Sequence, residues 1–239
     1  MACPSPDSPP TYEPSNEDSP PAYDGEAIGT IFPAQLAIYR KTGLLRPVTA
    51  VLAAHESTPL HHISLGVGLL DAGLPDVALH ANANEGSSII ARSKLDSSDD
   101  SHSVQLTDFG SPISEDIKLR SRSSSRKYVF TIDCEGPGMK ANSTQGFEWR
   151  PSRGQDVRGL GLRDYGWKLV WLEDPTNNLV DHGTSLGVVA VWSRCSSANS
   201  KKMMGFRFLG KGSTGDFGKH WEVMAVVTAL AIWHTEITD

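Results

Sequence analysis

Cysteine is scarce in this chain. Its 239 residues include Cys3, Cys134 and Cys195 only. No two of them have the spacing of a metal-binding pair, and an odd number is a poor disulfide framework. We therefore expect a protein of a reducing compartment, with a cytoplasmic localisation, and no structural metal. Cys134 and Cys195 lie in or beside predicted strands without an activating partner in the sequence, so we expect both to be buried structural thiols.

Long apolar runs are also absent. The longest extends from Trp221 to Trp233 and is interrupted by Glu222 and Thr228. A membrane-spanning helix needs about 20 apolar residues, so this segment is more typical of a buried core helix. The first residues include no apolar stretch of the kind found in signal peptides, so we expect no signal peptide.

Positive charge is missing from the first 26 residues. Met1–Glu26 contains six acidic residues and no Lys or Arg, and so accounts for the whole net charge of −6. Seven prolines and few apolar residues complete this segment, which cannot bury enough surface to offset the entropy of ordering it. We expect residues 1–26 to be a disordered tail. The remaining chain is neutral, and a neutral body does not favour a nucleic-acid partner.

Apolar and polar residues alternate in the second half of the chain. This period of two is typical of strands with one buried face. The residues expected to share a face are Tyr128, Phe130, Ile132 and Cys134; Phe147 and Trp149; Trp167, Leu169 and Trp171; Leu186, Val188, Ala190 and Trp192; and Met204, Phe206 and Phe208. Turn-forming segments separate these five strands, which favours an antiparallel sheet.

The first half gives weaker signals. Short strands are expected at 61–67, 77–80, 88–91 and 103–107, and residues 111–126 are polar enough to predict a long surface loop. Residues 27–59 form a poorly defined lead-in, for which we expect an early strand followed by a short helix near Val48 to His55.

The period changes near the end of the chain. Apolar residues between His220 and His234 cover nearly every side of a predicted helix. A helix that is apolar on all sides must be enclosed. The simplest arrangement is a closed or nearly closed antiparallel barrel around it, which also removes exposed strand edges. The expected fold class is therefore mainly β.

This order of elements resembles the tubby C-terminal-like superfamily, which includes phospholipid scramblases and plant LURP-one-related proteins. The likeness extends over residues 60–236 and is clearest at Phe147-Glu148-Trp149-Arg150, Gly166-Trp167-Lys168-Leu169, Val189-Ala190-Val191-Trp192 and Trp221 to Trp233. The chain also resembles fungal members that join this domain to a proline-rich head. The resemblance implies a barrel surrounding a hydrophobic C-terminal helix.

Two copies of the PPxY motif lie in the tail. They are Pro9-Pro10-Thr11-Tyr12 and Pro20-Pro21-Ala22-Tyr23, and PPxY is the ligand of WW domains. Adjacent prolines favour the polyproline II helix, so little entropy is lost on docking into an aromatic groove. Two motifs can raise avidity for tandem WW domains. The competing interpretation is that a proline-rich composition produces the match by chance.

A basic, serine-rich segment forms the last part of the predicted loop. Arg120, Arg122, Arg126 and Lys127 are candidate contacts for phospholipid headgroups, although four cations are at the low edge of a lipid-binding cluster. The alternative is a solvated loop. Some members of the resembled superfamily bind phosphoinositides, but their basic residues have no positional match here.

Other motifs give little evidence of chemistry. His61 and His62 are adjacent on a predicted strand and should point to opposite faces, so a shared metal is not expected. Gly210 to Gly215 lacks the order of a phosphate-binding loop. The sequence therefore favours a non-enzymatic adaptor without a cofactor, whose PPxY motifs recruit WW-domain proteins such as ubiquitin ligases. The alternatives are a phospholipid-binding or scramblase-like protein at the membrane periphery and an enzyme with an unfamiliar site.

Overall fold

The fold is that of a computed structural model of the chain. The structure describes residues 30–41, 49–66, 75–96, 101–107, 117–122, 127–137, 139–140, 143–173, 185–195 and 200–238, and for residues 117–122 only the backbone.

Twelve strands form one antiparallel sheet in these ranges. They are β1 (Gln35–Lys41), β2 (Thr49–Ala53), β3 (Pro59–Leu65), β4 (Val77–His80), β5 (Ile89–Asp96), β6 (Ser101–Leu106), β7 (Ile117–Arg122), β8 (Lys127–Cys134), β9 (Ser143–Ser152), β10 (Gly166–Leu172), β11 (Ser185–Arg194) and β12 (Lys202–Phe208). Each strand pairs with its neighbours in the sequence, and β1 pairs with β12 as well as with β2. This is the hydrogen-bonding order of a closed barrel.

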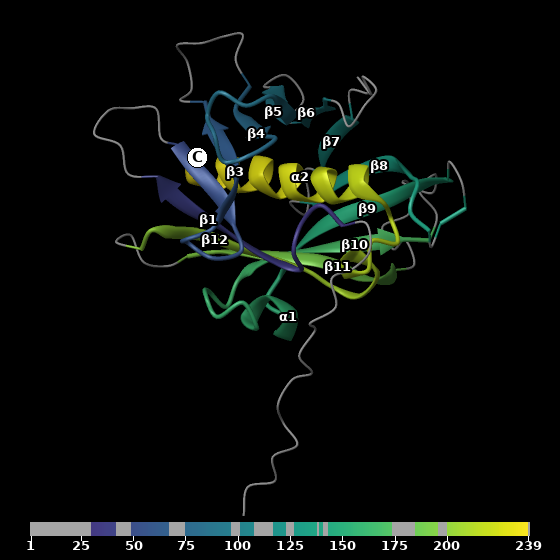
Figure 1. Cartoon of the computed structure of the whole chain (residues 1–239). Coiled ribbons are helices and arrows are strands. Elements are labelled where there is room, and N and C mark those ends of the chain that lie inside the picture. Colours follow the sequence, from purple (N-terminus) through teal and green to yellow (C-terminus); the bar gives the residue numbers. More distant parts are fainter. Residues whose placement is uncertain are drawn as a thin grey trace, which may run out of the picture.

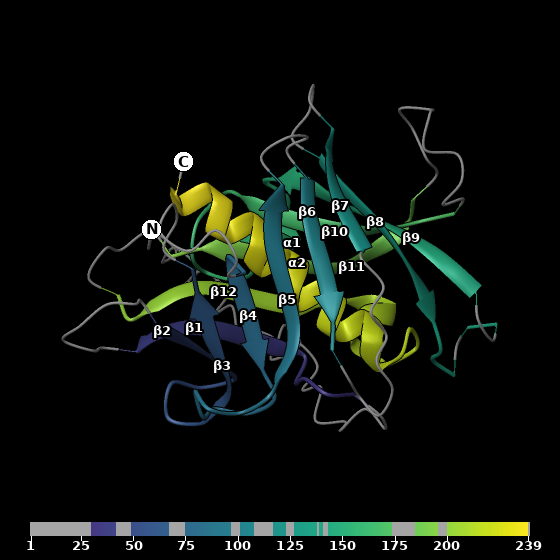
Figure 2. The same cartoon turned by 90° about the horizontal axis from the view of Figure 1, so that it is seen from above.

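Helix α2 (Lys219–Thr238) runs through the middle of the strands, as Figures 1 and 2 show from two directions. It contacts β4, β5 and β6 on one side and β8 and β11 on the other. Every residue from Trp221 to Trp233 is at most 2% exposed. The prediction that folded β structure shelters this segment is confirmed, and so is the mainly β fold class with a C-terminal helix.

The one hydroxyl in the middle of α2 is fully satisfied. Thr228 Oγ1 lies 2.7 Å from the Met224 carbonyl oxygen, to which it donates, and it accepts a hydrogen bond of 3.0 Å from Trp149 Nε1 on β9. A buried polar group costs little once it is paired, so the threonine fits an interior helix and fixes it against the sheet.

The predicted alternation holds along β8. Phe130, Ile132 and Cys134 belong to the core, whereas Thr131 and Asp133 are exposed. Strands with this pattern place one face on α2 and the other on the outside of the sheet.

The predicted alternation along β11 was wrong at two positions. Val188 packs in a cluster on the outer side of the sheet and Leu186 is 47% exposed, whereas Ala190 and Trp192 face the core. The pairing with β10 shifts register between Leu169 and Val170, whose partners are Ala190 and Val188. A bulge of this kind inserts one extra residue and moves the following side chains to the opposite face.

The sheet begins earlier than the sequence indicated. β1 and β2 lie within the expected lead-in, before the expected domain start at residue 60. The short helix expected near Val48 to His55 was wrong, because residues 49–53 form β2 between β1 and β3. Hydrogen bonding to neighbours on both sides outweighs weak local propensity here.

The long loop expected at residues 111–126 also needs correction. Ile117–Arg122 forms β7, which pairs with β6 and β8. The segment has few apolar residues, but the strands on either side both supply partners for its backbone N–H and carbonyl groups.

A small unit covers the outer side of the sheet. Between β9 and β10 the chain forms α1 (Gln155–Arg158), which lies on the side of β10 and β11 away from α2 (Figure 1). Val157 and Leu160 pack there against Val191 and form a second hydrophobic cluster outside the main core. We call residues 153–165 the α1 arm.

Candidate functional site

Aromatic side chains fill the interior at the N-terminal end of α2. Phe217 lies 4.6 Å from Trp221 and 5.3 Å from Phe147 between ring centroids, and Phe208 lies 5.7 Å from Trp221. Close aromatic packing of this kind supplies much of the buried apolar area of a core. Because α2 and these rings occupy the interior, the surfaces that can meet a partner lie on the outside of the sheet.

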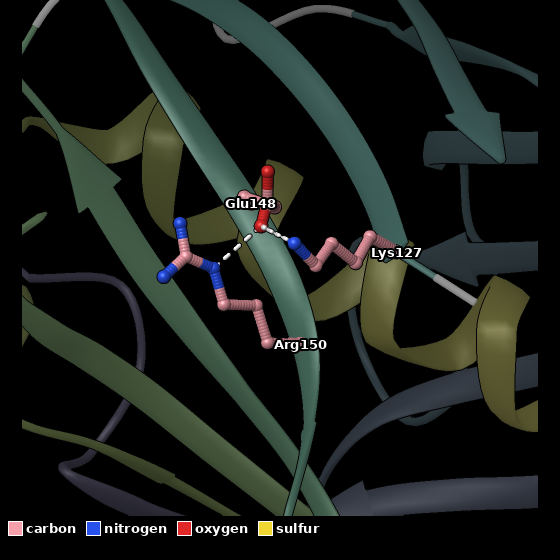
Figure 3. Close-up of polar contacts among 3 residues, drawn as sticks. All are labelled: Lys127, Glu148 and Arg150. Atoms are coloured by element: carbon pink, nitrogen blue, oxygen red, sulfur yellow. Dashed lines mark hydrogen bonds and ion pairs between the residues drawn. The ribbon is translucent and has the colours of Figure 1, made fainter. Parts of the chain in front are cut away.

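The most highly organised charged group on the outer side surrounds Glu148. This carboxylate on β9 is 4% exposed, and Arg150 Nε lies 2.5 Å and Lys127 Nζ 3.8 Å from its Oε1 atom. Figure 3 shows the two cations approaching Glu148 from either side. The two cations compensate the cost of burying the carboxylate, and the group keeps one net positive charge.

Further cations continue this surface across the sheet. Arg150 on β9 is in register with Lys168 on β10, Lys168 with Val191 on β11, and Val191 with Arg207 on β12. The α1 arm sits over this row, and the Arg207 guanidinium donates to the Asp156 carbonyl oxygen at 3.1 Å.

The arm adds arginines of its own, all of them exposed. We call this surface the basic face and define it as Lys127, Arg150, Arg153, Arg158, Arg163, Lys168 and Arg207, with the acidic residues Glu148, Asp156 and Asp164. Seven cations against three carboxylates make it electropositive, although residues 27–239 as a whole are neutral.

A second basic feature lies on β5 and β6. A shallow groove of about 200 Å³ is lined by Pro75, Arg92, Lys94, Ser103 and Gln105. Arg92 Nε donates to Gln105 Oε1 at 2.6 Å, which holds the guanidinium along the sheet. Such a groove can accept an anion, but it is small and open.

Glu222 is a buried carboxylate in the first turn of α2. Its Oε2 atom accepts hydrogen bonds from the backbone N–H groups of Ile31, at 2.7 Å, and Phe32, at 3.3 Å. Burial raises the pKa of Glu222, and the two backbone hydrogen bonds and the charge of Lys219 oppose that rise. The contact ties the start of the described chain to the first turn of α2.

Three histidines lie close together on β3 and β4. His80 Nδ1 donates to the Ser87 carbonyl oxygen at 2.9 Å, so its Nε2 accepts from Ser64 Oγ at 2.9 Å when the ring is neutral. The His62 ring packs edge-on against His80 and is fully buried. Burial and the neighbouring His80 lower the pKa of His62, which favours the neutral ring.

The predicted metal and thiol assignments can now be compared with the structure. His61 contacts Phe32 of the core while His62 contacts His80, as expected for adjacent strand residues. No group of three or more metal-ligating side chains occurs in the described ranges. Cys134 is buried as predicted, and burial raises the pKa of its thiol to about 12. Cys195 is only half-buried, so that expectation was wrong.

The predicted binding residues are only partly described. The WW-binding residues Pro9, Pro10, Tyr12, Pro20, Pro21 and Tyr23 lie outside the described residues, as does Arg126. Arg120 and Arg122 lie on β7 rather than in a loop, and the backbone of Arg122 is paired with that of Lys127. The structure brings Lys127 together with Glu148 and Arg150.

Sequence reasoning missed most of the basic face. Arg150 and Lys168 alternate with the core positions Trp149, Trp167 and Leu169 of the predicted strands. The sequence does not connect them, because their proximity depends on the register between β9 and β10. The arginines of the α1 arm gave a local signal, three cations in eleven residues, that composition alone did not distinguish from a solvated loop.

Among the described helices, none is both long and apolar enough to cross a bilayer. Comparison with known proteins gave no match to a family model, a curated protein or a solved structure. Function must therefore be argued from this chain's own residues.

Proposed function

We propose that this chain is a non-enzymatic adaptor whose tail recruits WW-domain proteins, among them ubiquitin ligases, while the folded domain supplies a second binding surface. The observation that carries the proposal is the pair of PPxY motifs, eleven residues apart in an acidic, proline-rich segment. The filled interior supports it, because contacts with partners then belong to the tail and the outer face. We further propose a barrel of the tubby C-terminal-like type, on the enclosed helix and the closed pairing order.

Capture by WW domains tests the recruitment claim. In a pull-down with tandem WW domains, Tyr12→Ala plus Tyr23→Ala should reduce capture of the full chain at least tenfold, because truncating a buried aromatic anchor typically costs about 2 kcal/mol or more. Pro4→Ala plus Pro14→Ala, which leaves both motifs intact, is the matched control. Equal capture of wild type and the double tyrosine variant would reject recruitment.

A second candidate function is binding to anionic phospholipid. The basic face favours it, since clustered Lys and Arg side chains are attracted to anionic headgroups by about 1 kcal/mol each. The scramblase-like version, in which α2 enters the bilayer, has less support because α2 is enclosed over thirteen residues. Flotation of the full chain with vesicles tests this candidate, and no co-migration with either neutral or anionic vesicles would remove it.

A further inference from the structure

The charges of this chain are unevenly distributed along the sequence. The first 26 residues hold six acids and no Lys or Arg, whereas the basic face gathers seven cations around three carboxylates. Each PPxY motif is followed directly by an acid, Glu13 after Tyr12 and Asp24 after Tyr23. An acidic residue that contacts the basic face would therefore bring a WW-binding motif against the sheet.

The tail enters the fold beside the basic face. Ala34 accepts a backbone hydrogen bond from Phe208, and Gln35 is in register with Arg207, which lies at one end of the row that leads to Lys168 and Arg150. Ile31 and Phe32 are held by Glu222, which fixes the point from which the tail departs.

The distances are compatible with contact. Neighbouring strands are about 4.8 Å apart, so Arg150 lies about 15 Å and Lys127 about 19 Å from Arg207 across the sheet. Ile31 is held by Glu222, so the chain that can move starts there, with seven residues to Asp24 and eighteen to Glu13. An extended chain covers at most about 3.3 Å per residue, so these segments reach up to about 23 Å and about 59 Å. Glu13 therefore has enough chain to reach Lys127 and Arg150, and Asp24 has enough to reach the near end of the face at Arg207, in both cases at a high effective concentration.

We propose that the basic face is the docking surface of the chain's own acidic tail, and that docking restrains the PPxY motifs from WW domains. The inference rests on the proposed WW recruitment for its consequence, but not for the docking itself. Ion pairs between exposed groups are individually weak and are screened by salt, so docking is reversible and a WW domain competes with it.

Carbodiimide cross-linking of the full chain tests docking directly, because it joins carboxylates to lysine amines in contact. At about 50 mM salt, where the Debye length exceeds 10 Å, tail acids should link to Lys127 or Lys168 and not to the exposed Lys140, and about 1 M salt should abolish the links. Mixing labelled and unlabelled protein separates links within one chain from links between chains. Absent links, or equal linking to Lys140, would overturn the proposal.

WW affinity tests the consequence. Lys127→Gln plus Lys168→Gln should bind tandem WW domains about threefold to tenfold more tightly than wild type at low salt, with the difference lost at high salt. Lys140→Gln is the matched control, and Arg153→Gln plus Arg158→Gln on the exposed arm is a second variant that leaves Glu148 with both partners. Unchanged affinity in both variants would overturn the restraint.

The two proposals fail in different ways. A tail peptide of residues 1–29 that does not bind WW domains would reject recruitment, while the cross-links would still report docking. Wild type that lacks the cross-links but floats with anionic vesicles, in a manner lost in Lys127→Gln plus Lys168→Gln, would assign the face to a membrane and reject the tail as its occupant.

Discussion

Glu222 and Glu148 are both buried carboxylates, and the chain compensates them differently. Glu148 has two cations, at 2.5 and 3.8 Å, on the outer side of the sheet. Glu222 lies at the mouth of the interior and accepts two backbone N–H groups through Oε2. Burial raises the pKa of Glu222 by more than its two backbone hydrogen bonds and the charge of Lys219 lower it, so Glu222 should respond to pH.

The pH dependence of Glu222 has a definite sign. Burial raises its pKa in the folded protein above the ordinary value of 4.5. The unfolded chain then loses this proton at a lower pH than the folded chain does, so the associated stability is complete below pH 4.5 and is lost as pH rises through the folded pKa. Glu222→Gln keeps an acceptor for Ile31 and Phe32 but cannot ionise.

We therefore expect the free energy of unfolding of Glu222→Gln, relative to wild type, to increase as pH rises from about 4 towards neutrality. Denaturant titrations at several pH values measure it. Glu173→Gln, at an exposed carboxylate, is the control and should follow wild type closely. A difference between Glu222→Gln and wild type that stays constant with pH would contradict the assignment.

At the scale of single elements, α2 is the main source of buried apolar surface. Leu230 is fully buried in the middle of the helix, whereas Ile237 near its end is 39% exposed. Leu230→Ala should lower the free energy of unfolding by about 2–5 kcal/mol, since it leaves a cavity in an enclosed site. Ile237→Ala on the same helix should change it by less than about 0.5 kcal/mol. Chemical denaturation of both variants gives the comparison, and equal effects would mean that α2 is not enclosed.

The elements differ in how far the sequence predicts them. The strands around Phe130, Trp149, Trp167 and Phe206 and the helix from Trp221 follow from hydrophobic periodicity, because each buries a large apolar face. β2 was missed because its short run of consecutive apolar residues has no period of two, and β7 was missed because its residues are mostly polar. Both strands are recognised only from their pairing with the strands on either side. The outward position of Val188 depends on a bulge in the pairing with β10, and the hydrophobic periodicity of the sequence does not reveal this bulge.

The PPxY motifs and the basic face also differ in how far the sequence predicts them. The PPxY motifs are local in sequence and were found there, although the structure does not describe them. The basic face joins β8, β9, β10, β12 and the α1 arm, so it exists only once the register between strands is known. Lys127 was proposed for a serine-rich loop, but its observed neighbours are Glu148 and Arg150.

At the scale of the whole molecule, α2 fills the interior, so a partner can contact only the outer surface of the sheet. The sheet then serves as a support that presents a basic face, with an acidic tail entering beside it. The scramblase-like alternative requires the opposite behaviour, because α2 would have to leave its shelter. Binding of partners on the outer surface therefore requires α2 to remain inside the strands.

Amide hydrogen exchange of the full chain tests this claim most directly. Residues 224–232 of α2 should exchange as slowly as the central amides of β9 and β10, near the limit set by global unfolding, and anionic vesicles should leave this exchange unchanged. Exchange of α2 that is much faster than that of β9 and β10, with or without vesicles, would contradict an enclosed helix.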